Sequence, residues 1–320
     1  MDMRRLRYFN TIADYGSFSA ASRRLKIAQP ALSRQIRLLE EEVGVELFTR
    51  SLNGVVLTEA GNRLYRHVQA LMHQFGQTRE IAQGELGGVA GEVAIGLPTT
   101  ICAILAKPLL DAALRRYPKV RIRLVESLGS VIREMLESGS LDLAVLYNIE
   151  ATNRLAVDEL MVEDLCLVGV ADPALEGLTT LEFRQLARFP LVLSSTAQSL
   201  RRLLETMAVS EGIELNIRLE VDSVHLTRYI AEEGLAYTVA SHGVFHQEVE
   251  SGRLRAIDIV NPRIRRSVAI VSAAGRQSLT SQHLHRLIRE IAQGLVHTGQ
   301  WRAGLIESDG IAPAPDGPGA

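Results

Sequence analysis

Cysteine, tryptophan and long apolar runs are all scarce in this sequence of 320 residues. Its two cysteines, Cys102 and Cys166, are too few for a disulfide scaffold. The longest runs without Asp, Glu, Lys or Arg are Val93 to Ala106 and Gly234 to Gln247. Both are shorter than the roughly 20 residues of a membrane-spanning helix, and no apolar signal core follows Met1 to Arg5. We therefore expect a cytoplasmic protein that does not associate with membranes.

The sequence also lacks a large net charge, because 35 basic residues balance 37 acidic ones. The charges are unevenly distributed, however. Residues 1–39 hold eight basic and two acidic side chains, and residues 1–58 hold nine and six. The remaining residues are net acidic, with 26 basic and 31 acidic side chains. A basic head on an acidic body indicates a polyanionic partner for the head alone.

The head has the pattern of a winged helix-turn-helix. Apolar residues at helical spacing predict helices over 4–15, from Phe18 to Leu25, and from Pro30 onward. Gly16 ends the first helix, and Ser17 can cap the second. Short apolar runs on either side of Asn53-Gly54 then predict a hairpin, because both turn residues tolerate positive φ. Residues 1–58 are the predicted DNA-binding domain.

A long helix should run from Thr58 to about Gln83. Its apolar seam steps 4, 3, 4, 3, 4 through Leu64, Val68, Leu71, Phe75, Thr78 and Ala82. That spacing is typical of a coiled-coil contact between two chains, although the same face could pack on its own domain. We interpret residues 59–90 as a dimerisation linker that ends in a hinge at Gly84, Gly87, Gly88 and Gly91.

Residues 91–303 alternate between strand and helix patterns. The order β-α-β-α-β occurs twice, which predicts an α/β fold of two parallel-sheet lobes with a cleft at the carboxyl ends of their strands. Two stretches, near Asp158–Ala171 and Ile257–Val271, would cross between the lobes. Residues 304–320, rich in Pro and Gly, are predicted to be a disordered tail.

Particular motifs resemble those of the LysR-type transcriptional regulators. In the head they are Gly16-Ser17-Phe18, Ala20-Ala21, Ala28-Gln29-Pro30-Ala31-Leu32-Ser33 and Thr58-Glu59-Ala60-Gly61, and beyond it Tyr117-Pro118 and Leu141-Asp142-Leu143-Ala144. Arg4-Arg5-Leu6-Arg7-Tyr8-Phe9 and Ile27-Ala28-Gln29-Pro30 are similar to the nitrogen-assimilation-control subgroup. The resemblance implies a regulator that binds double-stranded DNA, forms homodimers or homotetramers, can contact RNA polymerase, and carries a C-terminal part like type 2 periplasmic binding proteins. It also implies a small effector in the interlobe cleft.

Chemistry assigns separate roles to the polar residues of the head. Side chains at the start of the third helix can reach base edges in a major groove, and nearby cations can hold phosphates. Gln29 suits adenine, Arg34 suits guanine or a phosphate, and Arg50 and Asn53 would lie in the wing. The candidate DNA-binding residues are Gln29, Pro30, Ala31, Ser33, Arg34, Arg37, Arg23, Arg24, Lys26, Arg50 and Asn53. The resemblance leads us to expect a basic wing turn, and Leu52-Asn53 departs from that pattern.

Hydroxyl groups gather where the predicted strands of the two lobes end. Together with free backbone N–H groups at helix starts they suit a small anion, such as an anionic metabolite. The candidates are Thr99, Thr100, Ser127, Ser130, Tyr147, Ser194, Ser195, Thr196 and Ser223. Each hydroxyl could instead only cap a helix. A regulator controlled by its abundance or assembly, without any effector, therefore stays open.

Other classes of function find less support in the sequence. Ser194-Ser195 lacks a nucleophile-elbow pattern, and no phosphate-binding loop or metal-ligand cluster is apparent. We therefore expect no enzyme activity, no cofactor and no metal. A transport-type binding protein is the alternative for residues 90–300, but it leaves the basic head unexplained.

Overall fold

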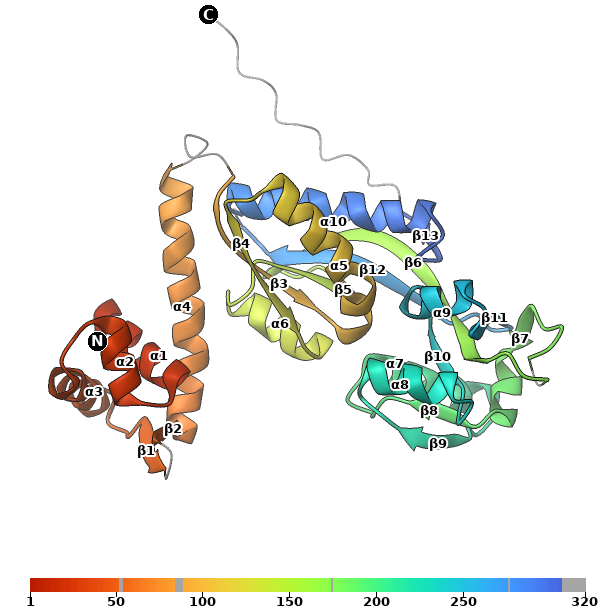
Figure 1. Ribbon diagram of the computed structural model, residues 1–320, viewed down its shortest axis with the longest axis horizontal. Helices are drawn as coiled ribbons and strands as arrows, with labels where there is room; N and C mark the ends of the chain where they lie inside the picture. Colours follow the sequence, from red (N-terminus) through yellow and green to blue (C-terminus); the bar gives the residue numbers. More distant parts are fainter. Residues whose placement is uncertain (52–53, 84–88, 174, 276, 307–320) are drawn as a thin grey trace, which may run out of the picture. The chain divides into compact units, whose positions relative to one another are not determined.

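The computed structural model describes residues 1–51, 54–83, 89–173, 175–275 and 277–306 (Figure 1). The chain forms two compact units. One contains the N-terminal residues as far as the long helix α4, and the other contains nearly all of the later residues.

Three helices form the core of the first unit: α1 (Met3–Tyr15), α2 (Phe18–Leu25) and α3 (Gln29–Val43). Gly16 ends α1 at a φ of 60°, a left-handed conformation that favours glycine. Ser17 then caps α2, since its side chain accepts a hydrogen bond from the Ala20 N–H. The apolar stripes of the helices meet in one core with the buried side chains Leu6, Phe9, Ile12, Ala21, Leu32, Ile36 and Leu39. The three predicted helices are confirmed.

A hairpin and a long helix follow. Strands β1 (Phe48–Ser51) and β2 (Gly54–Leu57) pair in antiparallel fashion, as expected for a wing. Leu52 and Asn53 of the predicted turn lie outside the described residues. Helix α4 (Glu59–Gln83) is capped by Thr58, whose Oγ1 accepts from the Gly61 N–H at 2.9 Å.

The predicted seam of α4 divides into two parts. Val68 is fully buried and Leu64 packs on the core of its own unit. One turn further on, Leu71 and Phe75 are 43% and 65% exposed. The interpretation that the seam packs on its own domain therefore holds for Leu64 and Val68. For Leu71 and Phe75, the contact between two chains stays a prediction. The side chain of Ala82 and the hinge glycines at 84, 87 and 88 lie outside the described residues.

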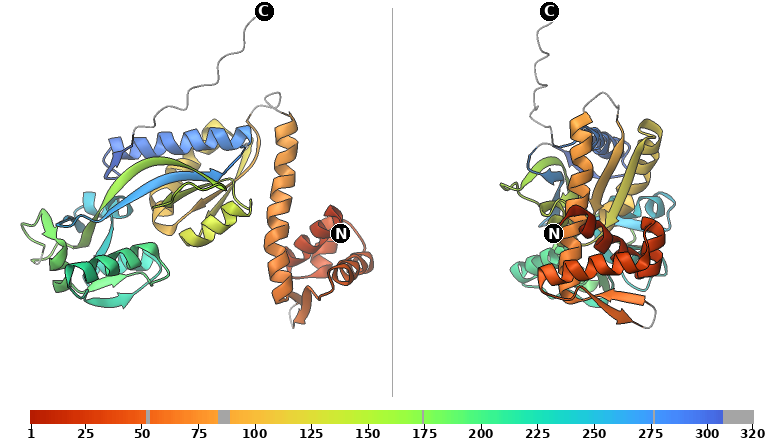
Figure 2. Two further views of the ribbon diagram at one scale, coloured as in Figure 1. Left: turned by 180° about the vertical axis from the view of Figure 1, so that it is seen from behind. Right: turned by 90° about the vertical axis from the view of Figure 1, so that its left-hand side faces the viewer.

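The second unit begins with a lobe of three parallel strands. These are β3 (Gly91–Leu97), β4 (Val120–Glu126) and β5 (Leu143–Tyr147), connected by α5 (Thr99–Arg116) and α6 (Gly129–Glu137). Figures 1 and 2 show α5 and the C-terminal helix α10 (Leu279–His297) on one face of this sheet and α6 on the other. The predicted β-α-β-α-β order is confirmed here.

The second lobe departs in part from the predicted parallel sheet. Its elements are β7 (Thr180–Glu182), η2 (Phe183–Arg188), β8 (Leu191–Leu193), α7 (Ser199–Glu211), β9 (Ile217–Glu220), α8 (Val224–Glu232), β10 (Thr238–Ser241), η3 (His242–Phe245), α9 (His246–Glu250) and β11 (Leu254–Val260). Strands β8 and β9 are parallel, but β10 pairs antiparallel with the crossing strand β6 (Leu155–Val170). Only a single parallel bridge, Leu191 to Tyr237, connects β8 to the start of β10.

Two long strands connect the lobes, as the crossing stretches predicted. β6 and β12 (Arg265–Ala273) run antiparallel, and Figure 2 shows these two long strands side by side. The order of the strands in their sheet is β4-β3-β5-β12-β6-β11-β7. The short strand β13 (Ala303–Leu305) also pairs with β6, so the predicted tail begins inside a strand. Residues 307–320 lie outside the described residues.

Two large clusters of buried side chains fill the second unit. The first is built on β3, β5, α5 and α10 and includes the fully buried Trp301, while the second surrounds Phe183, Leu186 and Leu204. Among the described helices, none has the length and hydropathy required to cross a bilayer.

Candidate nucleic-acid interface and effector cavity

The start of α3 is presented by a tight connection from α2. Lys26 adopts a φ of 57°, which turns the chain, and its N–H donates to carbonyls at the end of α2. The small Ala21 is fully buried where α1, α2 and α3 pack together. Across the turn, the Ser19 hydroxyl donates to Gln29 Oε1 at 2.9 Å and fixes that amide. The packing of Ala21 and the hydrogen bond from Ser19 to Gln29 therefore orient the first turn of α3.

Helix α3 presents a polar strip opposite its buried face. Gln29, Pro30, Ala31, Arg34 and Arg37 are exposed, and Ser33 is half-buried. No side chain caps the start of α3, so the N–H groups of Gln29 and Ala31 are also available to an anion, whereas Pro30 has none. The predicted base-reading residues Gln29, Pro30, Ala31, Ser33 and Arg34 thus lie along one side of one helix. Arg37, predicted to hold a phosphate, follows them on the same side.

The predicted phosphate contacts are more dispersed. Arg23 and Lys26 are exposed at the end of α2, and Arg50 is exposed on β1. Arg24 instead lines a surface hollow of α1 and α2 together with Arg7 and Tyr15. Arg7 is a cation that sequence reasoning missed, since only its position beside Arg24 in the fold associates it with the others. Asn53 lies outside the described residues.

The wing is held against α3 by a carboxylate. Glu40 Oε1 accepts hydrogen bonds from the N–H groups of Leu47 and Phe48 at 2.8 and 3.4 Å. Because Glu40 is on α3, these bonds fix the start of β1, and hence Arg50, relative to that helix. The basic residues of α3 and of the wing are therefore held in a fixed arrangement.

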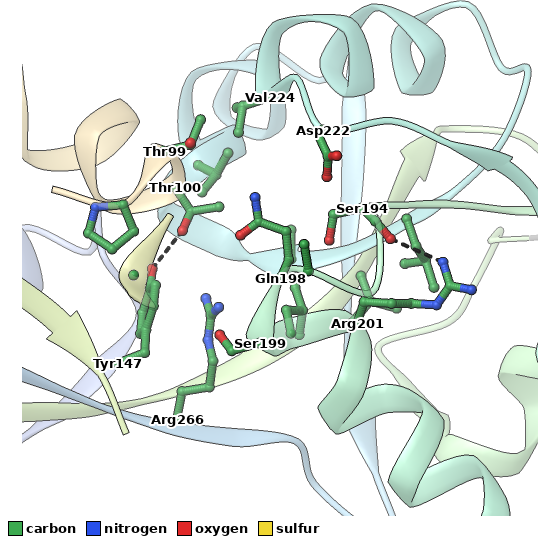
Figure 3. Close-up of a pocket in the computed structure, with 18 of the residues that line it drawn as sticks. Thr99, Thr100, Tyr147, Ser194, Gln198, Ser199, Arg201, Asp222, Val224 and Arg266 are labelled. Atoms are coloured by element: carbon green, nitrogen blue, oxygen red, sulfur yellow. Dashed lines mark hydrogen bonds between the residues drawn. The ribbon is translucent and has the colours of Figure 1, made fainter. Parts of the chain in front are cut away.

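In the second unit, a cavity of about 350 Å³ lies between the two lobes (Figure 3). That volume suits a small metabolite. Six of the nine predicted effector residues line it, namely Thr99, Thr100, Ser130, Tyr147, Ser194 and Ser223. Because strands of both lobes end at this cavity, residues far apart in the sequence meet there.

The other three predicted residues do not line the cavity. The hydroxyl and N–H of Ser195 both donate to Asp222 Oδ1, at 3.1 and 3.0 Å, and the Thr196 carbonyl accepts from Arg202. The Ser127 N–H continues the strand pairing by donating to the Leu97 carbonyl. These three residues shape the loops at the strand ends. Ser223 lines the cavity but also caps α8, so for this hydroxyl the capping interpretation holds.

The hydroxyls of Thr100 and Tyr147 lie 3.0 Å apart on the first-lobe wall of the cavity. Burial raises the pKa of the Tyr147 phenol well above its usual value, so the phenol stays protonated. Thr99 and Thr100 are the first residues of α5, which has no side-chain cap, and Ser199 likewise begins the uncapped α7. Two helix N-termini therefore direct positive partial charge into the cavity.

Arg266 was missed by sequence reasoning, because only its strand was predicted. It lies on β12 and lines the cavity, and its guanidinium carbon is 3.7 Å from the centre of the Tyr147 ring. Gln198, Arg201 and Arg202 of the second lobe were also missed. Their positions on the wall depend on how the lobes pack, which no local motif signals.

Comparison with known proteins gives matches in both units. The family described as "Bacterial regulatory helix-turn-helix protein, lysR family" matches residues 3–62, and "LysR substrate binding domain" matches residues 86–293. The transcriptional regulator BbuR of Bordetella bronchiseptica is 30% identical over 304 residues, 94% of this chain and 93% of its own. The nitrogen assimilation regulatory protein nac of Klebsiella aerogenes is 40% identical over 174 residues, 54% of this chain and 57% of that protein.

Solved structures show the same fold. Full-length OxyR from Pseudomonas aeruginosa superposes with a TM-score of 0.69 at 23% identity, covering 92% of this chain and 95% of its own. CbnR complexed with its target DNA gives a TM-score of 0.68 at 21% identity, covering 91% and 99%. The helix-turn-helix, the long helix and the two lobes therefore occur together in other full-length chains.

Proposed function

Since the chain belongs to the LysR family of bacterial transcriptional regulators, we propose that it reads operator DNA through α3 and responds to a small anionic metabolite. In this proposal residues 1–58 bind DNA, residues 59–90 pair two chains, and residues 91–303 bind the effector. It acts beside the chromosome in the cytoplasm and is not an enzyme.

The observation that best supports DNA reading is the exposed first half of α3. A helix in a major groove contacts base edges mainly through its N-terminal residues. In this chain those residues are Gln29, Ala31, Ser33 and Arg34, held on a buried stripe of Leu32, Ile36 and Leu39. Ser19 already orders the Gln29 amide, which reduces the entropy lost when that amide pairs with adenine.

The interlobe cavity favours control by an effector over control by abundance alone. Four arginines line it, namely Arg133, Arg201, Arg202 and Arg266, against the single carboxylate of Asp222 among the lining residues. Hydroxyls and uncapped helix N-termini add hydrogen-bond donors. An anionic metabolite that binds both walls would stabilise the closed arrangement of the lobes.

The partly exposed seam of α4 supports pairing of two chains. Leu71 and Phe75 lie one turn apart on the same face, and neither is covered by its own unit. A second α4 with the same residues would bury both. We propose a homodimer through this helix and, following the family, a homotetramer built from two such dimers, which can contact RNA polymerase at its promoters.

The test of DNA reading is Arg34→Ala. Operators are first selected from genomic DNA at two salt concentrations, since the salt dependence gives the number of phosphates neutralised. We expect the substitution to cost about 1–3 kcal/mol and to relax the preference at one base pair.

The matched control is Arg63→Ala, because Arg63 is an exposed arginine on α4 that pairs with Glu59. Operator affinity should change little in this variant. Equal affinities for the wild type and the Arg34 variant, with unchanged base preference, would refute the role of α3 in reading the operator.

A further inference from the structure

A buried ion pair lies at the wall of the effector cavity. The Glu163 side chain is fully buried, and Arg266 is 3% exposed. Arg266 Nε donates to Glu163 Oε1 at 3.0 Å, and Nη2 donates to the same oxygen. The two residues come from the two strands that connect the lobes, β6 and β12.

Glu163 has two further partners from other parts of the second unit. Its Oε2 accepts from Ser241 Oγ of β10 at 2.7 Å and from Trp301 Nε1 at 2.6 Å. The carboxylate therefore receives hydrogen bonds on both oxygens, which offsets part of the cost of burying its charge. These contacts hold Glu163 firmly, and Glu163 in turn fixes the orientation of Arg266.

The remaining edge of Arg266 is available to the cavity. Both bonds to Glu163 use Nε and Nη2. The guanidinium also interacts with the Tyr147 side chain, so a ligand would meet the Nη1 edge beside that phenol. The guanidinium stacks on Tyr147, and Figure 3 shows it rising between Tyr147 and Ser199. An oxygen ligand placed there would meet donors from both lobes.

The charges around this edge favour an anion. Arg201 is already used by Glu205, Glu220 and the Ser194 carbonyl. The carboxylate of Asp222 accepts from Ser195 on the far side of the cavity (Figure 3). The uncapped starts of α5 and α7 supply positive partial charge near Arg266. Apolar side chains, among them Val192, Val224 and Phe245, also line the cavity.

We propose that Arg266 is the residue that recognises the effector, that the group it binds is a carboxylate on a short apolar body, and that Glu163 is its positioning residue. This inference depends on the proposed effector function of the cavity. Glu163 holds the guanidinium in place but also neutralises it, so it limits the affinity for the anion. Trp301, the only tryptophan in the chain, donates a hydrogen bond to the same carboxylate, so its fluorescence can report changes at Glu163.

The experiment uses two probes of matched shape, butyrate and its neutral amide, butyramide, with the full-length protein. Calorimetry gives the affinities, and the emission of Trp301 reports changes at Glu163. We expect butyrate to bind more tightly than butyramide and to shift the emission. Arg266→Gln should weaken butyrate binding by about tenfold to a hundredfold, with little effect on butyramide.

Glu163→Gln separates positioning from simple structural support. It removes the neutralising charge and leaves Arg266 buried without a counter-ion, so the free protein should melt at a lower temperature. Bound butyrate would then serve as the counter-ion, and its affinity should rise. A purely structural role predicts instead that affinity falls with stability.

Two more variants control for the possibility that a single substitution at the buried ion pair disrupts folding. The double variant Arg266→Met with Glu163→Met removes both charges, a change that buried pairs often tolerate, and it should bind butyrate no better than butyramide. Arg201→Gln removes a similarly buried arginine, one that lines the cavity from the second lobe and is already paired with Glu205 and Glu220, and it should keep the preference for the acid.

Several outcomes would overturn the inference. They are equal affinity of the wild type for acid and amide, no binding of butyrate, binding that leaves Trp301 emission unchanged, or a preference lost in the Arg201 variant and kept in the Arg266 variant. Operator binding is measured on the same samples. If it persists in any of these cases, the role of Arg266 fails while the DNA-binding function stands.

Discussion

The two cysteines show how the fold sets the chemistry of single residues. Burial raises the pKa of the Cys102 thiol to about 11, with Glu126 adding to the effect, and burial raises the pKa of Cys166 to about 12. Both thiols are therefore protonated at neutral pH, and a thiol is far less nucleophilic than a thiolate. We interpret both cysteines as packing residues.

Alkylation with iodoacetamide measures this directly. In the native protein at pH 8 we expect labelling of Cys102 to be about a hundredfold slower than in guanidinium-unfolded chains, because a rise of about two pKa units depletes the thiolate by that factor. The pKa of the Cys102 thiol is higher in the native protein than in the unfolded chain. The stability that this thiol contributes is therefore lost as pH rises from about 9 towards 11. Fast native labelling at pH 8 would contradict this expectation.

Only some of the residues at the cavity could be predicted from the sequence. Thr100 and Tyr147 could be found because each follows a predicted strand, and strand ends of one sheet share an edge. Arg266 and Glu163 lie within crossing strands, where a charged residue gives no sign of facing inward. Only the pairing of β6 with β12 brings the two together.

At the scale of elements, helix α4 contains two glycines in very different surroundings. A Cβ at Gly61 would lie 2.1 Å from the Leu47 carbonyl oxygen, whereas a Cβ at Gly76 would meet nothing within 4 Å. Gly61 therefore permits the close approach of α4 to the residue that precedes the wing, and Gly76 only weakens the helix.

The pair Gly61→Ala and Gly76→Ala tests this assignment. The free energy of unfolding of the first unit is measured by chemical denaturation. We expect Gly61→Ala to lower the free energy of unfolding by about 2–4 kcal/mol, because backbone has to move. Gly76→Ala should raise it by about 0.5–1 kcal/mol through helix propensity. Equal effects of the two substitutions would show that the close approach at Leu47 does not limit packing.

The elements themselves were largely predictable, because local signals agree with the fold. The cap at Ser17 and the apolar alternation of β3 illustrate this agreement. The second lobe was harder, since β10 has the alternation of a strand in either direction. Its antiparallel pairing with β6 is decided by the long crossing strand, a partner far away in the sequence.

At the scale of the whole molecule, charge and apolar surface occupy different segments. The basic excess lies in residues 1–39, and the exposed apolar pair Leu71 and Phe75 lies on α4. The sequence predicted this division, because charge counts and heptad spacing need no tertiary structure. It did not predict where the seam changes from core to surface, since that depends on how far the first unit covers α4.

Phe75→Asp tests whether the exposed part of the seam pairs two chains. A charge at this position would have to be buried against a second copy of the helix, so we expect dissociation at concentrations where the wild type is dimeric. Light scattering gives the mass, and gel shifts give the affinity for an operator with two half-sites. Loss of pairing should weaken binding to the full operator far more than to a single half-site, because linked sites bind with a high effective concentration.

Asn62→Asp adds the same charge to the opposite, exposed side of α4 and should leave the mass unchanged. An undiminished dimer in the Phe75 variant would mean that this face of α4 is not where the two chains meet.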